Sequence, residues 1–165
     1  MSVLNTLSAV FNIAIAALIA TAVFNLSEAR AQAEQRVATQ IECLAKNIYY
    51  ESRSENIEGQ IGVGHVTMNR VNNSYWPDTI CEVVYQKFQF SWTHLVKNQT
   101  PGNKKLYAAI YKLSEKLYNG EIGDNTDGST FYYADYIAKP NWAKQMEKSV
   151  QLGVHIFYKW DGTWD

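Results

Sequence analysis

The sequence predicts a mostly helical α+β domain with a small β-sheet, preceded by an apolar amino-terminal helix. Two stretches, 37–53 and 57–71, carry apolar residues at the three- and four-residue spacing of buried helix faces. Two later runs, "TFYYA" at 130–134 and "VHIFYKW" at 154–160, are rich in the β-branched and aromatic residues that favour strands. The first 27 residues contain no charged side chain.

The apolar amino terminus points to export. A helix over residues 3–26 would be about 36 Å long at 1.5 Å per residue, which is enough to cross a bilayer. The following "EARAQA" contains small-x-small patterns of the signal-peptidase type, although no Lys or Arg precedes the apolar run. We therefore expect residues 1–27 to be a signal anchor, uncleaved or releasable, or else a cleaved signal peptide. A buried helix of a soluble protein is the remaining reading.

The rest of the chain divides into a linker and one domain. Residues 28–40, "EARAQAEQRVATQ", are polar with alanine and predict a short helical linker, and residues 41–165 are long enough for a domain with its own core. In the helix over 57–71, Gly62 and Gly64 cost about 1 kcal/mol each against alanine. We expect close approach of another backbone or of a ligand to compensate.

Shorter elements follow. Asp78 or Thr79 can cap a helix that ends near Tyr85, and the cap and first-turn proline of Thr100-Pro101 predict a helix through Leu117. "NWAKQMEKSVQ" at 141–151 predicts a further helix between the two strands.

Composition excludes some classes of function. The net charge is −1, which gives no basic footprint for nucleic acid. The two cysteines, Cys43 and Cys81, and the three histidines show no zinc-ligand spacing, so we expect neither a metal nor another cofactor. A disulfide in an exported domain and two buried thiols are both compatible with the cysteines. Aromatic residues make up 13% of the chain, and exposed Tyr and Trp can stack on sugars.

Glu51 is the candidate catalytic acid. It lies at a helix end, on the margin of the apolar stripe near Leu44, and follows Tyr49 and Tyr50. Apolar surroundings raise the pKa of a carboxyl group, and glycosidic bond cleavage needs an acid that is still protonated near neutral pH. A solvated residue, or one paired with Arg53, is the alternative. Neighbouring Glu55 and Glu58 are better explained by turn capping or ion pairing.

Five blocks in order, "CLAKNIYYESRSENIEGQIGVGHVTMNRV", "WPDTICEVVYQ", "QFSWT", "GSTFYYADY" and "GVHIFY", resemble the SleB-type cell-wall hydrolases, which include spore cortex-lytic enzymes. The resemblance covers about residues 41–160. It implies a lysozyme-like fold and cleavage of peptidoglycan strands between N-acetylmuramic acid and N-acetylglucosamine, typically by lytic transglycosylation. It also implies that Glu51 is the catalytic glutamate, and that Cys43 and Cys81 form a disulfide. The expected partners are peptidoglycan glycan strands and, through residues 1–27, the inner membrane, and no nucleic acid is expected.

By the same resemblance we expect a set of residues to contact the glycan strand: Tyr50, Gln60, Asn69, Gln89, Ser91, Trp92 and Tyr132. Core packing is the alternative for Trp92 and Tyr132, and backbone hydrogen bonding within a loop for Gln89 and Ser91. The chain departs from the family pattern at Phe88 and His94, where many relatives carry a second cysteine pair.

A single-acid lytic transglycosylase is the favoured mechanism, because no second carboxylate matches Glu51; Asp135 and Glu58 are the weaker candidates. The alternatives are a hydrolytic muramidase, an amidase or peptidase, and a non-catalytic wall-binding protein held at the membrane. The build of the chain resembles phage endolysins with a signal anchor, and an exported periplasmic remodelling enzyme is the competing setting.

Overall fold

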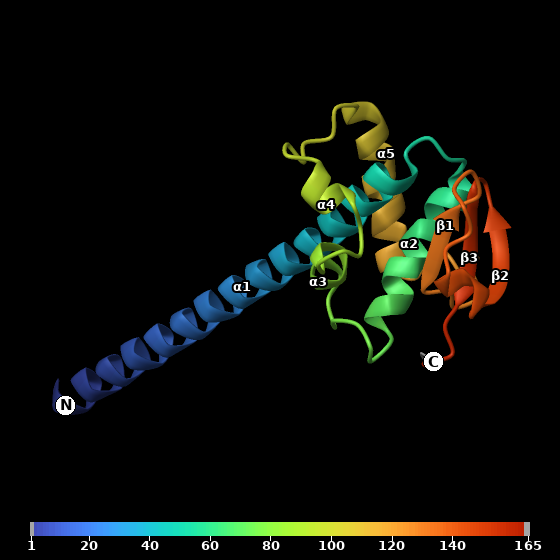
Figure 1. Cartoon of the computed structure of the whole chain (residues 1–165). Coiled ribbons are helices and arrows are strands. Elements are labelled where there is room, and N and C mark those ends of the chain that lie inside the picture. The colour runs from blue at the N-terminus through green and yellow to red at the C-terminus, as the bar shows by residue number, and fades with distance from the viewer. Residues whose placement is uncertain (1, 164–165) are drawn as a thin grey trace. The chain divides into compact units, whose positions relative to one another are not determined.

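The computed structural model describes the backbone of residues 2–163 and the side chains of residues 18–163 (Figure 1). Its elements in chain order are α1 (Ser2–Ser52), α2 (Ile57–Val71), α3 (Ile80–Tyr85), α4 (Trp92–Leu95), α5 (Lys104–Tyr118), β1 (Phe131–Ala134), a 3-10 turn (Trp142–Lys144), β2 (Glu147–Leu152) and β3 (His155–Lys159). A mostly helical domain with a small sheet is therefore confirmed.

The chain forms two compact units, Met1–Ala38 and Thr39–Asp165. Helix α1 contributes all of the described part of the first unit and, with its last turns, enters the second. Among the described residues, no helix combines the length and apolarity needed to cross a bilayer. The anchor or signal peptide predicted over 1–27 lies largely outside the residues with described side chains and stays a prediction, as does the linker over 28–40.

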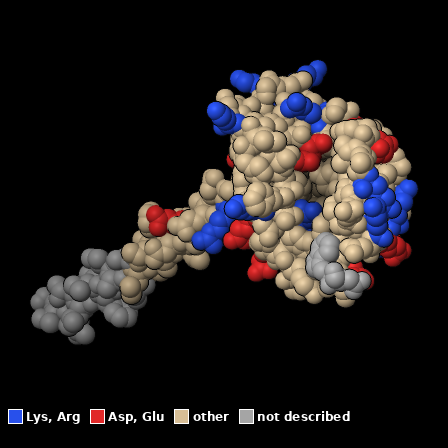
Figure 2. Space-filling model, viewed as in Figure 1, with Lys and Arg blue, Asp and Glu red and all other residues tan. Residues whose placement is uncertain are grey.

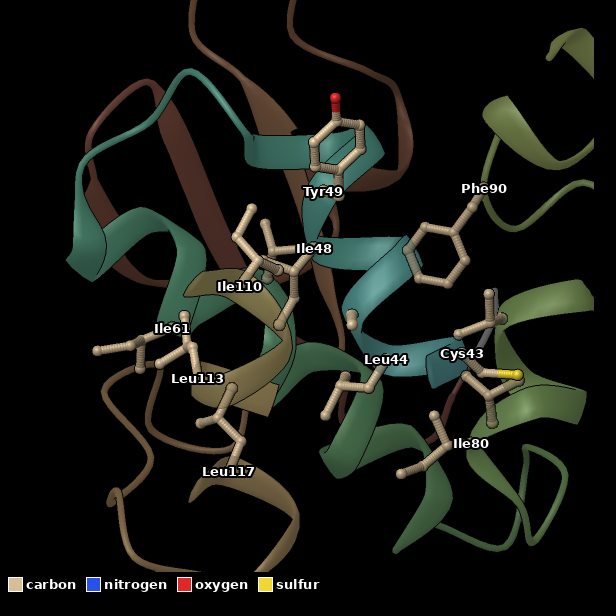
Figure 3. Close-up of a cluster of buried hydrophobic side chains, with 14 of the residues drawn as sticks. Cys43, Leu44, Ile48, Tyr49, Ile61, Ile80, Phe90, Ile110, Leu113 and Leu117 are labelled. Atoms are coloured by element: carbon tan, nitrogen blue, oxygen red, sulfur yellow. The ribbon is translucent and has the colours of Figure 1, made fainter. Parts of the chain in front are cut away.

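The core of the second unit forms where the last turns of α1 meet α5 and α2. Leu44 and Ile48 are fully buried, and Figure 3 shows them beside the α5 side chains Ile110, Leu113 and Leu117. These residues repeat at three- and four-residue intervals on both helices, which is why each helix buries one face. The packing fixes the end of α1, and with it Glu51.

Helix α2 passes through the centre of this unit, and two of its glycines, Gly62 and Gly64, make room for neighbours. A Cβ on Gly62 would lie 2.6 Å from Cζ of Phe157, and one on Gly64 would lie 2.6 Å from Cδ1 of Leu117. The expected close approach is therefore present, but the partners are side chains from β3 and α5 rather than a backbone or a ligand.

The sheet is antiparallel with the order β1-β3-β2. The helix predicted over 141–151 was wrong: its first residues form a 3-10 turn and the rest is the edge strand β2. Helix formers such as Lys and Glu are tolerated there because pairing with β3 satisfies the backbone. The start of α5 was also misplaced, since Asn103 caps the helix by accepting from the Leu106 amide, and Pro101 precedes it.

A disulfide joins Cys43 of α1 to Cys81 of α3, with the two Cα atoms 5.2 Å apart. The pairing implied by the family resemblance is thus present. It ties α1, whose last turn carries Glu51, to the short helix α3. The segment 86–95 that follows α3 forms one wall of the cavity described below.

The disulfide should contribute substantially to stability. Closing a loop of 38 residues removes chain entropy from the unfolded state, so the double variant Cys43→Ala/Cys81→Ala should lose about 3–4 kcal/mol of unfolding free energy. Urea unfolding measures the loss. The reductant TCEP should destabilise the wild type by a similar amount and leave the double variant unchanged. Equal sensitivity of both proteins would contradict the assignment.

Candidate active site

Glu51 lies in the last turn of α1 and is half-buried. Its Oε2 accepts a 2.9 Å hydrogen bond from the hydroxyl of Tyr132 on β1. Burial raises the pKa of Glu51 above its usual value, while the Tyr132 hydrogen bond and the positive charge of Arg70 oppose the rise. The environment therefore favours a protonated carboxyl group but stabilises the carboxylate when it forms, as an acid that must also act as a base requires.

Glu51 faces a cavity of about 280 Å³, lined by Glu51, Arg70, Phe88, Gln89, Phe90, Ser91, His94 and Tyr132. Figure 2 shows this face hollowed between the part of the molecule that carries α4 and the part that carries the sheet. Among these lining residues, Glu51 is the only carboxylate. Of the residues expected to contact a glycan, Gln89, Ser91 and Tyr132 lie here.

Arg70 was not among the predicted site residues. It is 4% exposed, and its Nε donates to the Thr130 carbonyl oxygen at 2.8 Å. Its guanidinium lies over the rings of Trp76, Phe90 and Phe131 at 5.8, 5.1 and 5.5 Å from their centroids. Burial lowers its pKa to about 10, so the group remains charged near neutral pH.

The described residues include no direct ion pair between Arg70 and Glu51. Nη1 of Arg70 is buried and has no hydrogen-bond partner in the described part of the chain. A direct pair would hold Glu51 ionised, whereas a cation at a greater distance favours the carboxylate without preventing protonation. The signal available in the sequence was a lone arginine on a helix that is apolar around most of its girth.

Trp92 lies in the core rather than in the cavity. It is 4% exposed, its Nε1 donates to Oδ1 of Asn47 at 2.9 Å, and its ring stacks on Tyr50 at 4.7 Å. Neither ring is among the lining residues. Trp92 thus fits the core alternative, and its ring anchors the wall segment 86–95, while a substrate contact for Tyr50 stays a prediction.

Gln60 and Asn69 are also engaged elsewhere. Nε2 of Gln60 donates to the carbonyl oxygen of Glu55 at 3.0 Å, at the start of α2. Nδ2 of Asn69 donates to the Asp124 carboxylate and to the Ser129 carbonyl oxygen, both at 3.0 Å. These side chains hold the turn after α1 and the loop before β1, and neither lines the cavity. Both side chains thus have structural roles, and their expected substrate contacts stay predictions.

Three other acids, Glu55, Glu58 and Asp135, were considered beside Glu51. Each accepts a hydrogen bond within the fold. Oε2 of Glu55 accepts a 3.0 Å hydrogen bond from the Val154 amide, which joins the α1–α2 turn to the β2–β3 turn. Glu58 accepts from Nδ2 of Asn125, and Asp135 accepts from Nε2 of Gln151. None of the three is among the residues that line the cavity.

The family described as Cell Wall Hydrolase matches residues 54–158, well over half of the chain. The chain belongs to the Cell Wall Hydrolase family. The match begins just after Glu51 and includes the other residues that line the cavity.

The relatives of this cell wall hydrolase confirm the SleB-type resemblance. A spore cortex-lytic enzyme of Oceanobacillus iheyensis is 30% identical over 122 residues, 72% of this chain and 41% of that protein. A spore cortex-lytic enzyme of Bacillus subtilis is 24% identical over 119 residues, 71% and 36%. The chain thus spans about two fifths of the length of these curated relatives.

Two solved structures share the fold. The catalytic domain of the Bacillus cereus SleB protein is 27% identical, with a TM-score of 0.61 over 73% of this chain and 89% of that one. The catalytic domain of the germination-specific lytic transglycosylase SleB from Bacillus anthracis is 26% identical, with a TM-score of 0.60 over 73% and 93%. The mostly helical domain with its three-stranded sheet is therefore that of a SleB catalytic domain.

Proposed function

We propose that this cell wall hydrolase cleaves peptidoglycan strands between N-acetylmuramic acid and N-acetylglucosamine as a lytic transglycosylase with Glu51 as its single catalytic residue. The observation that carries the proposal is the half-buried carboxyl group of Glu51, with a raised pKa, in a cavity whose other described lining residues include no carboxylate. The related structure from Bacillus anthracis, described as a lytic transglycosylase, supports the same reaction class.

In the first step, protonated Glu51 donates its proton to the oxygen that bridges the two sugars, and the glycosidic bond breaks. The resulting carboxylate then takes the proton of the muramic acid 6-hydroxyl, whose oxygen bonds to the anomeric carbon and closes an anhydro ring. The two steps return Glu51 to its protonated form and consume no water. The Tyr132 hydroxyl and the charge of Arg70 stabilise the carboxylate between the steps.

A hydrolytic muramidase is the second candidate. A pair of carboxyl groups about 5–5.5 Å or about 6.5–9.5 Å apart would favour it, since retaining and inverting glycosidases use such pairs. Glu51 has no such partner among the lining residues. An amidase or peptidase would need a metal ion or a reactive cysteine. Activity that withstands EDTA and thiol blockers would exclude both.

Product analysis tests the proposal. Purified peptidoglycan digested with the full chain should yield fragments that end in anhydromuramic acid, which mass spectrometry distinguishes from reducing ends by the mass of one water. Reducing ends alone would establish hydrolysis and overturn the transglycosylase assignment. Intact glycan strands with released peptides would establish an amidase.

We also propose that residues 1–27 deliver the protein to the membrane or beyond it, where its substrate lies. The charge-free stretch supports this placement. Amino-terminal sequencing of protein recovered from the membrane and periplasmic fractions separates a retained anchor from a cleaved signal peptide.

A further inference from the structure

Phe88 holds an unusual conformation at the edge of the cavity. Its φ is 67°, in the left-handed region, and its side chain is 76% exposed. A bulky aromatic residue rarely adopts this conformation, which is costly for any residue with a Cβ. Exposure of a large ring also leaves its apolar surface in water. Neither feature is explained by packing within the described part of the chain.

The surroundings of Phe88 present its ring rather than bury it. The Lys87 ammonium lies 4.8 Å from the ring centroid, and the His94 ring meets it nearly edge-on at 6.0 Å and 80°. Even with these two neighbours, most of the Phe88 side chain stays open to solvent. Phe88 and His94 line the same cavity as Glu51.

We propose that Phe88 is a sugar-binding platform, on which the apolar face of one pyranose ring of the glycan strand stacks next to the bond cleaved at Glu51. The proposal rests on the proposed function, because the stacked sugar belongs to the same strand. Aromatic rings present a flat, electron-rich face that suits the C–H groups of a sugar. Strained residues that the fold retains cluster at ligand sites, and the outlier here coincides with the cavity.

Substitution at position 88 separates this role from a structural one. Asparagine tolerates the left-handed conformation, so Phe88→Asn should relieve strain and raise the melting temperature by about 2–4 °C, since a ring 76% exposed contributes little burial. The same variant should raise KM for soluble glycan fragments about tenfold, with kcat within about twofold, because only sugar binding is lost. Phe88→Trp should keep KM near the wild-type value.

Leu95 provides the matched control. It is 73% exposed in the same segment but is not among the lining residues, so Leu95→Ala should leave KM unchanged. An unchanged KM in Phe88→Asn would overturn the proposal, whether or not the melting temperature falls.

A binding measurement distinguishes this result from failure of the proposed function. In the full chain carrying Glu51→Gln, Phe88→Asn should weaken co-sedimentation with purified peptidoglycan about tenfold. If Glu51→Gln alone keeps its lytic activity, the proposed function fails while the platform can still be measured. If Glu51→Gln is inactive and binding is unaffected by Phe88→Asn, only the platform fails.

Discussion

Replacing Glu51 by glutamine should reduce glycan-strand cleavage by a factor of about 10²–10⁴. The amide keeps the size of the side chain and an oxygen that can accept from Tyr132, but it cannot donate or take up the transferred proton. Release of soluble fragments from purified peptidoglycan, measured over time for both proteins, gives the factor. Full lytic activity in Glu51→Gln would sink the single-acid mechanism.

The direction of the pKa shift also predicts whether Glu51→Gln stabilises or destabilises the fold. The folded-state pKa of Glu51 is raised by burial, so the folded protein binds this proton more tightly than the unfolded chain. The associated stability is present below the unfolded pKa and is lost as the pH rises through the folded one. Glu51→Gln should therefore unfold at a higher temperature than the wild type at neutral pH, with a smaller difference in acid. A destabilised variant at neutral pH would indicate a structural role.

Replacing Arg70 by methionine should lower the rate of cleavage by about tenfold or more and move the alkaline limb of the pH profile to higher pH. The guanidinium lowers the pKa of Glu51, so its removal raises that pKa and keeps Glu51 protonated to higher pH. The rate falls because the carboxylate formed after proton donation loses a stabilising charge. Initial rates between pH 4 and 9 measure both effects.

Arg70→Lys is the matched variant for charge. Lysine keeps the positive charge, so the alkaline limb should stay closer to that of the wild type than in Arg70→Met. Methionine fills a similar apolar volume between the aromatic rings, and the loss of the hydrogen bond to the Thr130 carbonyl should cost about 1–3 kcal/mol of unfolding free energy. An unchanged pH profile with a large loss of stability would make Arg70 a purely structural residue.

The fold was predictable where a local pattern and tertiary packing agreed. The bounds of α2 coincide with the predicted 57–71, because the same apolar spacing that indicates a helix also buries it. Strands β1 and β3 have the composition of strands and form them. Strand β2 was missed because "EKSVQL" has no strand pattern of its own, and its conformation depends on pairing with β3.

The site was predictable to the level of segments but not of every side chain. The resemblance indicated Glu51, "QFSW" and Tyr132, and the structure brings Glu51, Gln89, Ser91 and Tyr132 to one cavity. A matching motif does not say which way a side chain points, so buried Trp92 was taken for a sugar contact. Arg70 was missed because its proximity to Glu51 depends on how α2 crosses the end of α1. The conformation of Phe88 is likewise set by backbone geometry that residue type does not reveal.

The hydrogen bond from the Val154 amide to Glu55 has a consequence for motion. It fastens the β2–β3 turn to the α1–α2 turn, which follows Glu51. Gly153 beside it leaves little space for a side chain, since a Cβ there would meet Oε2 of Glu55. The sheet side of the cleft, with Tyr132, should therefore stay rigid relative to Glu51. The opposite side of the cleft, around Phe88, is then the part that can adjust to glycan strands with different substituents. Hydrogen exchange should therefore show slow opening at β3 and faster opening at 86–95.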